Sequence, residues 1–228
     1  MTPPGSARVS VLVVDDQDLV RGGLVAILRA SGVDVVGEAA DGPQAVQLTA
    51  ELHPDVVLMD IEMPGGDGLT ATRDILAVHP DVRVLVLTTF DLDEYIYQAL
   101  RLGASGFLLK TTAPARLADA VRACAAGEPL LSPAVTRQLI ETYLSRPREA
   151  TVDDRRLDSL SPRELDVLRA MARGRTNAEI GSTLHLSEAT VKTHITHIFA
   201  KLGLRDRAQA VVLAYEAGLV VPGGNARN

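Results

Sequence analysis

Five polar residues in the first half of the chain stand at the ends of short apolar runs. They are Asp15, Asp16, Asp60, Thr88 and Lys110, and the runs that they end or follow are Val9–Val14, Val56–Met59, Val84–Thr88 and Gly106–Leu109. The carboxyl ends of parallel strands meet at one edge of a sheet. If these runs are such strands, three carboxylates, one hydroxyl and one ammonium group share a single pocket.

The chemistry that such a pocket supports is phosphoryl transfer. Crowded carboxylates repel one another unless a cation neutralises them, and a site with oxygen ligands and no His or Cys favours Mg²⁺. A carboxylate beside Mg²⁺ and a lysine can attack a phosphoryl group and become an aspartyl phosphate, while Lys110 offsets charge on the transferring group. Any one of these residues alone is better explained as a solvated loop residue, but the complete set favours the pocket.

The segments that must position these residues have the pattern of an α/β domain. The four runs and a fifth, Val33–Ala39, are short, rich in Val and Leu, and apolar at successive positions, as is typical of strands buried on both faces of a parallel sheet. Apolar residues at helical spacing lie between them, as in Val20, Leu24, Ile27 and Leu28, and in Leu117, Val121 and Cys124. Five strands alternating with five helices predict a doubly wound, five-stranded parallel sheet.

Residues 9–126 resemble the receiver domain of two-component response regulators. The matching residues are the pair Asp15-Asp16, Asp60 within Met-Asp-Ile-Glu-Met-Pro-Gly-Gly-Asp-Gly, Thr88, and Phe107-Leu108-Leu109-Lys110. The resemblance implies that Asp60 accepts a phosphoryl group from a sensor histidine kinase and that Thr88 and Lys110 contact this group. It also implies that Asp16, Asp60 and the backbone carbonyl of Glu62 bind Mg²⁺, with Asp15 assisting through water, and that Thr88 and Phe107 form the switch.

Two other classes of protein remain as alternatives. A hydrolase that forms an aspartyl phosphate also uses an Asp nucleophile and Mg²⁺, but it needs a second Asp two residues after the nucleophile, where this chain has Glu62. A binding module with a degenerate pocket would work without phosphorylation, and the complete set of polar residues argues against it. Steady turnover of a phosphate ester favours the first alternative, and failure to react with acetyl phosphate favours the second.

The last third of the chain carries residues that typically begin and end successive helices. Ser161-Pro162-Arg163-Glu164 and Thr176-Asn177-Ala178-Glu179 are capping boxes. Two further helices can be capped by Ser187 and Asp206, and glycines that can end helices stand at Gly174, Gly203 and Gly218. A short helix, Asn177–Leu184, and the tight connection His185-Leu186 precede the helix that Ser187 begins. This order predicts a helix-turn-helix, whose second helix lies in the major groove of DNA.

The helix after Ser187 has one apolar and one polar face. Its apolar stripe is Val191, Ile195, Ile198 and Leu202, and the opposite face carries Lys192, Thr193, Thr196 and His197, none of them acidic. By pattern alone, an ordinary amphipathic helix of a four-helix bundle is an equal alternative. His194 and His197 could suggest a metal, but no third ligand stands near them.

Residues 159–221 resemble the LuxR-type helix-turn-helix of the NarL/FixJ class of response regulators. The matching segments are Leu160–Glu164 with Val167-Leu168, Asn177–Ile180, Leu186–His194 and Lys201–Leu204. The resemblance implies that Lys192, Thr193 and Thr196 face the groove and that Thr176, Thr190 and His197 lie near phosphates. It also implies that the last helix, around Val211–Ala217, is a dimer contact, so that we expect a homodimer when the chain is phosphorylated.

Composition agrees with two domains that have different partners. The net charge of −6 divides unevenly: residues 1–125 carry 9 Lys/Arg and 17 Asp/Glu, a net −8, whereas residues 159–228 carry 9 and 6, a net +3. A single cysteine, no long apolar stretch and no signal-peptide pattern predict a cytoplasmic protein that does not cross a membrane. The expected organisation is a tail (1–8), the receiver (9–126), a linker with a helix at 133–144 (127–158), the DNA-binding domain (159–221) and a tail (222–228).

Overall fold

A computed structural model describes residues 8–63, 68–88, 94–127 and 155–220 of the 228-residue chain. They belong to two compact units, one α/β and one helical. The helix expected at 133–144 lies outside the described residues.

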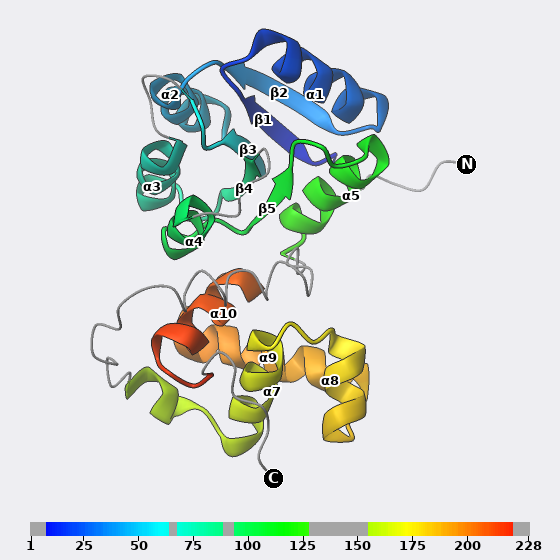
Figure 1. Ribbon diagram of the computed structural model, residues 1–228, viewed down its shortest axis with the longest axis vertical. Helices are drawn as coiled ribbons and strands as arrows, with labels where there is room; N and C mark the ends of the chain where they lie inside the picture. Colours follow the sequence, from blue (N-terminus) through cyan, green and yellow to red (C-terminus); the bar gives the residue numbers. More distant parts are fainter. Residues whose placement is uncertain (1–7, 64–67, 89–93, 128–154, 221–228) are drawn as a thin grey trace. The chain divides into compact units, whose positions relative to one another are not determined.

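The α/β unit contains one five-stranded sheet (Figure 1). Its strands are β1 (Ser10–Val14), β2 (Asp34–Ala39), β3 (Val56–Asp60), β4 (Arg83–Thr88) and β5 (Gly106–Leu109). They pair in parallel in the order β2-β1-β3-β4-β5, which confirms the doubly wound sheet. The strand order reverses between β1 and β3, and in such sheets a site forms beyond the carboxyl ends of the strands at this point.

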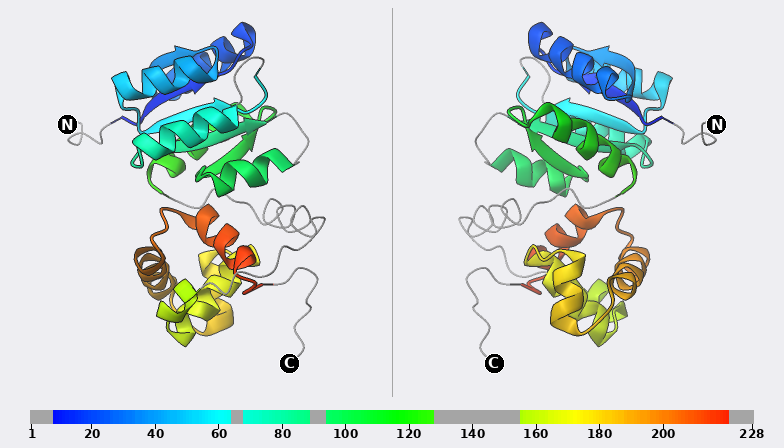
Figure 2. Two further views of the ribbon diagram at one scale, coloured as in Figure 1. Left: turned by 90° about the vertical axis from the view of Figure 1, so that its left-hand side faces the viewer. Right: turned by 90° about the vertical axis from the view of Figure 1, so that its right-hand side faces the viewer.

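Five helices connect the strands: α1 (Asp18–Ala30), α2 (Gly42–Leu52), α3 (Gly68–Val78), α4 (Glu94–Arg101) and α5 (Pro114–Ala125). The apolar residues of α1 and α5 share one core cluster with Val11, Val13, Leu58, Leu85 and Leu87. The alternate residues of these strands, such as Leu12 and Met59, are equally buried, and α2 and α3 pack against each other and against the sheet. Figure 2 shows helices on both faces of the sheet.

One strand departs from the sequence prediction. The run Val33–Ala39 was expected to be buried on both faces, but only Val35 and Ala39 of β2 are buried, and Asp34 and Glu38 are exposed. The reason is that β2 is an edge strand, with β1 as its single neighbour in the sheet. The exposed Glu38 carboxylate lies close to two arginines of α1, as described below.

The helical unit consists of η1 (Arg155–Ser159), α7 (Pro162–Ala172), α8 (Asn177–Leu184), α9 (Glu188–Leu202) and α10 (Arg207–Glu216). The predicted caps are confirmed: Ser161 and Thr176 form capping boxes, and Ser187 and Asp206 accept hydrogen bonds from the backbone three residues on. Gly174, Gly203 and Gly218 all have positive φ. The apolar stripe of α9 enters a core built with residues of α7, α8 and α10.

The connection between α8 and α9 depends on a close backbone approach. His185 ends α8 in the left-handed region, with φ 54°. Leu186 then donates its N–H to the Gly181 carbonyl at 2.8 Å. A Cβ on Gly181 would lie 2.7 Å from the Leu186 carbonyl oxygen, so no side chain fits there. Backbone contact at Gly181 therefore sets how closely the turn that leads into α9 approaches α8.

Candidate functional site

The carboxyl edge of the sheet brings an ammonium group between two carboxylates. Lys110, the residue after β5, places its Nζ 2.7 Å from Asp60 Oδ2 and 2.9 Å from Asp15 Oδ2. Both carboxylates are fully buried. Residues from three different strand ends thus meet, as the strand-end pattern predicts.

The third carboxylate completes an oxygen-only cluster. Carboxylate oxygens of Asp15, Asp16 and Asp60 all lie within 4.8 Å of one another. Asp16 Oδ1 is buried and has no hydrogen-bond partner among the described residues, whereas Asp60 Oδ1 accepts the Glu62 N–H at 3.0 Å. A buried carboxylate oxygen without a partner is costly unless a cation binds it. The donor set fits a hard divalent cation such as Mg²⁺.

The pKa shifts in this cluster show the cost of burying charged groups. Burial raises the pKa of Asp60, and the hydrogen bonds from Lys110 and from the Glu62 backbone oppose that shift only in part. Burial lowers the pKa of Lys110, but hydrogen bonds and charge interactions with Asp15 and Asp60 outweigh it, so this pKa is raised. The raised pKa of Lys110 favours an ammonium group beside Asp60, and burial disfavours the ionised form of the Asp60 carboxylate.

The two residues predicted as the switch lie on neighbouring strands. Thr88 is the last residue of β4 and is 1% exposed, and the Lys110 N–H donates to its carbonyl at 2.8 Å. Phe107 pairs with Val86, two residues before Thr88. Because side chains alternate along a strand, Phe107 and Thr88 belong to the same face of the sheet. Phe107 is 5% exposed, so its ring is packed inside.

A glycine that sequence reasoning did not single out fixes the backbone at Asp60. Gly68, the first residue of α3, packs against the Asp60–Ile61 peptide: a Cβ there would lie 2.2 Å from the Asp60 carbonyl oxygen and 2.7 Å from Ile61 Cα. Real Cβ atoms do not approach backbone atoms so closely. Gly68 was visible in the sequence as part of the Asp60 motif, but its contact was not.

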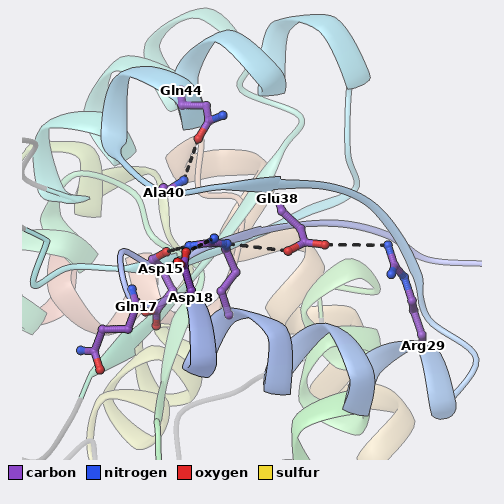
Figure 3. A network of polar contacts seen from close by, with 8 residues as sticks. Asp15, Gln17, Asp18, Arg29, Glu38, Ala40 and Gln44 are labelled. Carbon is purple, nitrogen blue, oxygen red and sulfur yellow. Dashed lines mark hydrogen bonds and ion pairs between the residues drawn. The ribbon is translucent and has the colours of Figure 1, made fainter.

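A second group that the sequence did not indicate surrounds the loop after β1 (Figure 3). Arg21 of α1 donates from Nη1 to the Asp15 carbonyl at 2.7 Å, pairs with Asp18 at 2.5 Å, and lies 3.7 Å from Glu38 of β2. Arg29, further along α1, lies 4.0 Å from the same Glu38 carboxylate. These contacts join residues up to 17 positions apart in sequence, which no local spacing reveals.

In the helical unit, the predicted outer face of α9 is exposed. Lys192, Thr193, Thr196 and His197 are all exposed. The Lys192 ammonium lies 3.6 Å from Glu188 in the first turn of the same helix, so an acidic residue does stand beside this face. The hydroxyls of Thr193 and Thr196 donate to carbonyls four residues earlier, at 3.1 Å each. In this state they offer acceptor oxygens and methyl groups outward rather than donors.

Two other predicted contact residues are engaged in helix caps. The Thr176 hydroxyl lies 3.0 Å from the Glu179 carboxylate within its capping box, and the Thr190 hydroxyl lies 2.8 Å from that of Ser187. Both residues are exposed at a helix start, where backbone N–H groups can also receive a phosphate. Arg207 of α10 secures this region, because its guanidinium donates to Asn177 Oδ1 at 3.1 Å and to the Arg175 carbonyl.

An ion pair between a buried carboxylate and a half-exposed lysine holds the far end of α9. Glu164 of α7 is only 4% exposed and accepts from Lys201 Nζ at 2.7 Å and from the Ser161 N–H at 2.7 Å. The hydrogen bond from Lys201 and that from the Ser161 backbone lower the pKa of Glu164 to about 2. The capping box was predictable from sequence, but the contact across 37 positions was not.

An acidic pocket at the carboxyl edge of a β2-β1-β3-β4-β5 sheet, joined in one chain to a helix-turn-helix, defines a DNA-binding protein with a receiver-type input domain. Comparison with known families agrees: residues 11–122 match the response regulator receiver domain, and residues 158–214 match the bacterial regulatory proteins of the luxR family. The chain belongs to the response regulators with a LuxR-type DNA-binding domain, the NarL/FixJ class.

Similar proteins span almost the whole chain. The transcriptional regulatory protein LiaR of Bacillus subtilis is 44% identical over 213 residues, which are 93% of this chain and 99% of that protein. The response regulator VraR of Staphylococcus aureus is 38% identical with the same coverage. Among solved structures, the response regulator ChrA of a heme-sensing two-component system is 38% identical with a TM-score of 0.51, covering 93% of this chain and 99% of that chain. A structure of RcsB dimers bound to DNA is 28% identical with a TM-score of 0.54, covering 92% and 99%.

These relatives are transcriptional regulators, which agrees with a regulator rather than the hydrolase considered above. None of the described helices combines the length and the apolar character that crossing a membrane requires. The one cysteine, Cys124, is a buried free thiol in α5.

Proposed function

We propose that Asp60 accepts a phosphoryl group from a sensor histidine kinase and that this modification controls DNA binding by α9. The observation that carries the proposal is the Lys110 ammonium held 2.7 Å from Asp60, beside a buried Asp16 oxygen that has no hydrogen-bond partner among the described residues. This arrangement brings a nucleophile, a cationic side chain and a carboxylate oxygen suited to a metal ion into one pocket.

The proposed reaction is an in-line displacement at phosphorus. A carboxylate oxygen of Asp60 forms a bond to phosphorus while the bond from phosphorus to the kinase histidine nitrogen breaks, and that nitrogen keeps the electron pair. Lys110 stabilises the charge on the phosphoryl oxygens. Asp16, Asp60 and the Glu62 carbonyl would hold Mg²⁺, with Asp15 assisting through water. When bound, Mg²⁺ supplies further charge neutralisation at the transferring group.

Thr88 is proposed to hydrogen-bond the phosphoryl group and to move when it does so, and Phe107 is proposed to respond to the movement of Thr88. Both residues belong to one face of the sheet and to adjacent strands, so a shift at the end of β4 reaches the packed ring of Phe107 through a direct neighbour. A new hydrogen bond at Thr88 would favour a second arrangement of this face.

The test of the phosphoacceptor is incubation with acetyl phosphate and Mg²⁺, followed by intact-mass measurement. Wild type should gain one acid-labile phosphoryl group, and Asp60→Asn should gain none. Asp74→Asn is the matched control, because Asp74 is a half-exposed carboxylate on α3 that pairs with its neighbour Arg73. Labelling of Asp60→Asn at the wild-type rate refutes the assignment.

For DNA, we propose that Lys192, Thr193 and Thr196 contact base edges and that Thr176, Thr190 and His197 lie near phosphates. A threonine with its donor committed to the helix can accept from a cytosine or adenine amino group or contact a thymine methyl group. Lys192→Ala should cost about 1–3 kcal/mol of binding if it contacts a base, or lower the salt slope by about one if it contacts a phosphate.

The Lys192–Glu188 pair offers a sharper comparison. Glu188→Gln removes a negative charge beside the proposed interface and releases Lys192, so it should tighten binding, opposite to Lys192→Ala. Arg169→Ala, which removes a positive charge from α7, controls for net charge. Equal affinities for all four proteins at two salt concentrations exclude Lys192 from the interface.

Phosphorylation is further proposed to promote a homodimer that reads two half-sites. The RcsB structure named above contains dimers on DNA. Part of α10, including Val211, Leu213 and Tyr215, is used by the core of its own helical unit, so a dimer contact through α10 would use its remaining residues. Sedimentation with and without beryllofluoride and Mg²⁺ tests this, and an unchanged monomer counts against it.

A further inference from the structure

We infer that Arg21 is a positioning residue for the divalent-cation side of the pocket, because it fixes the loop between β1 and α1 that presents Asp15 and Asp16. The inference rests on the proposed function and concerns how that same site is held. Arg21 stands five residues after Asp16, on the second turn of α1, and its side chain is 15% exposed.

Arg21 supplies the last of four contacts that immobilise Asp15. The Asp15 N–H donates to the Ala39 carbonyl at 3.1 Å, Oδ1 accepts the Gln17 N–H at 2.9 Å, and Oδ2 pairs with Lys110. The Asp15 carbonyl accepts a charge-assisted bond from Arg21 Nη1 at 2.7 Å. Among these four contacts, the one to the carbonyl is made by a side chain of α1.

The Asp15 carbonyl orients the residue that follows it. A peptide unit is planar, so a fixed carbonyl oxygen also fixes the Asp16 nitrogen and the direction in which the Asp16 Cα leaves. Asp16 itself has the buried, unpartnered Oδ1. Mg²⁺ accepts little deviation from octahedral geometry, so a small rotation of this peptide misplaces a ligand.

The two carboxylates around Arg21 argue for a positioning role over an electrostatic one. A guanidinium close to a cation site repels the cation, yet here it is paired with Asp18 and Glu38. Asp18, in the first turn of α1, and Glu38, on the edge strand β2, offset the charge of the Arg21 guanidinium and orient it. Figure 3 shows Asp15 and Asp18 close together, with Glu38 between them and Arg29.

An electrostatic role and a positioning role predict opposite changes in cation affinity when Arg21 is replaced. Removal of one positive charge should tighten cation binding if charge dominates. Loss of the Asp15 carbonyl bond should weaken it if positioning dominates, and residues that orient metal ligands typically contribute about 10–100-fold in metal affinity. We therefore expect Arg21→Met, which keeps the apolar stem, to bind the cation at least about tenfold more weakly than wild type.

The experiment uses the full chain and Mn²⁺ as the probe, with free Mn²⁺ measured by electron paramagnetic resonance. Arg29→Met is the matched control, because Arg29 is on the same helix and pairs with the same Glu38 carboxylate, at 4.0 Å, with a side chain that is 59% exposed. It should bind Mn²⁺ as wild type does or slightly more tightly. Arg21→Lys keeps the charge but loses the planar fork, and it should also bind more weakly than wild type.

A second readout reports the loop itself. Amide hydrogen exchange at 15–18 should be faster in Arg21→Met than in wild type, without a change at the residues of β4. Acetyl phosphate labelling across Mg²⁺ concentrations should show a raised half-saturating Mg²⁺ concentration and a maximal rate close to wild type. If Arg21→Met does not fold, Arg21→Lys carries the same comparisons.

The outcomes separate this inference from the proposed function. Wild type that neither binds Mn²⁺ nor labels with acetyl phosphate refutes the proposed function. Wild type that does both, with Arg21→Lys and the folded Arg21→Met binding Mn²⁺ as tightly as wild type or more tightly, overturns the role of Arg21 alone.

Discussion

Adding one methyl group at Gly68 should disable Asp60, the proposed phosphoacceptor, while leaving its carboxylate in the chain. In Gly68→Ala, the new Cβ would stand 2.2 Å from the Asp60 carbonyl oxygen, 2.7 Å from Ile61 Cα and 3.0 Å from the Asp60 carbonyl carbon. All three atoms are backbone, so no side chain can rotate away. Either α3 or the end of β3 must move.

The size of that movement follows from the contact distances. An ordinary Cβ contact begins near 3.4 Å, so the carbonyl oxygen and the new methyl group must separate by about 1 Å. A misplacement of about 1 Å at a reacting group can cost about 10²-fold in rate, and overpacking a tight site typically costs about 1–3 kcal/mol of stability. We expect acetyl phosphate labelling to slow by roughly two orders of magnitude.

The assay is the initial rate of labelling by intact mass at saturating Mg²⁺, together with the melting temperature. Gly22→Ala is the control, since a Cβ at Gly22 in α1 meets nothing within 4 Å. Replacement of a helical glycine by alanine should stabilise the α/β unit by about 0.5–1 kcal/mol and leave labelling unchanged. A Gly68→Ala protein that labels within twofold of wild type would show that the Asp60–Gly68 approach does not hold the nucleophile.

Three further perturbations test other parts of the molecule. Gly181→Ala places a Cβ 2.7 Å from the Leu186 carbonyl oxygen, so it should reduce DNA affinity at least about tenfold with acetyl phosphate labelling intact; equal DNA binding by fluorescence anisotropy contradicts this. Lys201→Met removes one of the partners that lower the pKa of Glu164 from 4.5 to about 2. Because Lys201 is half-exposed, solvent screening reduces its contribution to the free energy of unfolding to about 1 kcal/mol, which the variant should lose. A depressed pKa stabilises the fold fully above pH 4.5, and this stabilisation is lost as the pH falls through about 2. Urea unfolding followed by NMR of α9 amides should therefore separate variant from wild type at pH 7, by a difference in unfolding free energy that shrinks as the pH falls toward 2. Asp60→Asn should raise the melting temperature of the α/β unit at pH 7 in EDTA, because burial raises the pKa of Asp60 and the ionised form is disfavoured in the fold; a lower melting temperature would show that the Lys110 contact outweighs burial.

Local features of this chain were predictable because their physics is local. Ser161, Thr176, Ser187 and Asp206 cap helices where the sequence places them, since a cap needs only a side chain and a backbone N–H three residues away. The five strands follow from runs of buried Val and Leu. The pocket of Asp15, Asp60 and Lys110 followed because strand ends in a parallel sheet converge whatever the loops between them do.

The contacts that hold the site were not predictable because they join distant segments with no periodic signal. Arg21 to Glu38 and Lys201 to Glu164 depend on how a helix lies against a strand or another helix, which the pattern of one segment does not contain. The prediction for β2 was wrong for a related reason: its valines suggested a strand buried on both faces, but its place at the edge is set by the strand order of the whole sheet. The hydrogen bonds that the Thr193 and Thr196 hydroxyls donate to carbonyls of α9 depend on side-chain rotamers, which the sequence does not specify.

The backbone contact between Gly181 and Leu186 has a consequence for how such proteins diversify. The pose of α9 is set by a glycine and a carbonyl, while the exposed residues Lys192, Thr193 and Thr196 bond only within their own helix. Substitutions at these three positions therefore alter the surface that we propose contacts DNA, without tilting the helix that carries them. Over many generations, one scaffold can acquire new operator preferences by changing a few side chains, with little loss of stability at each step.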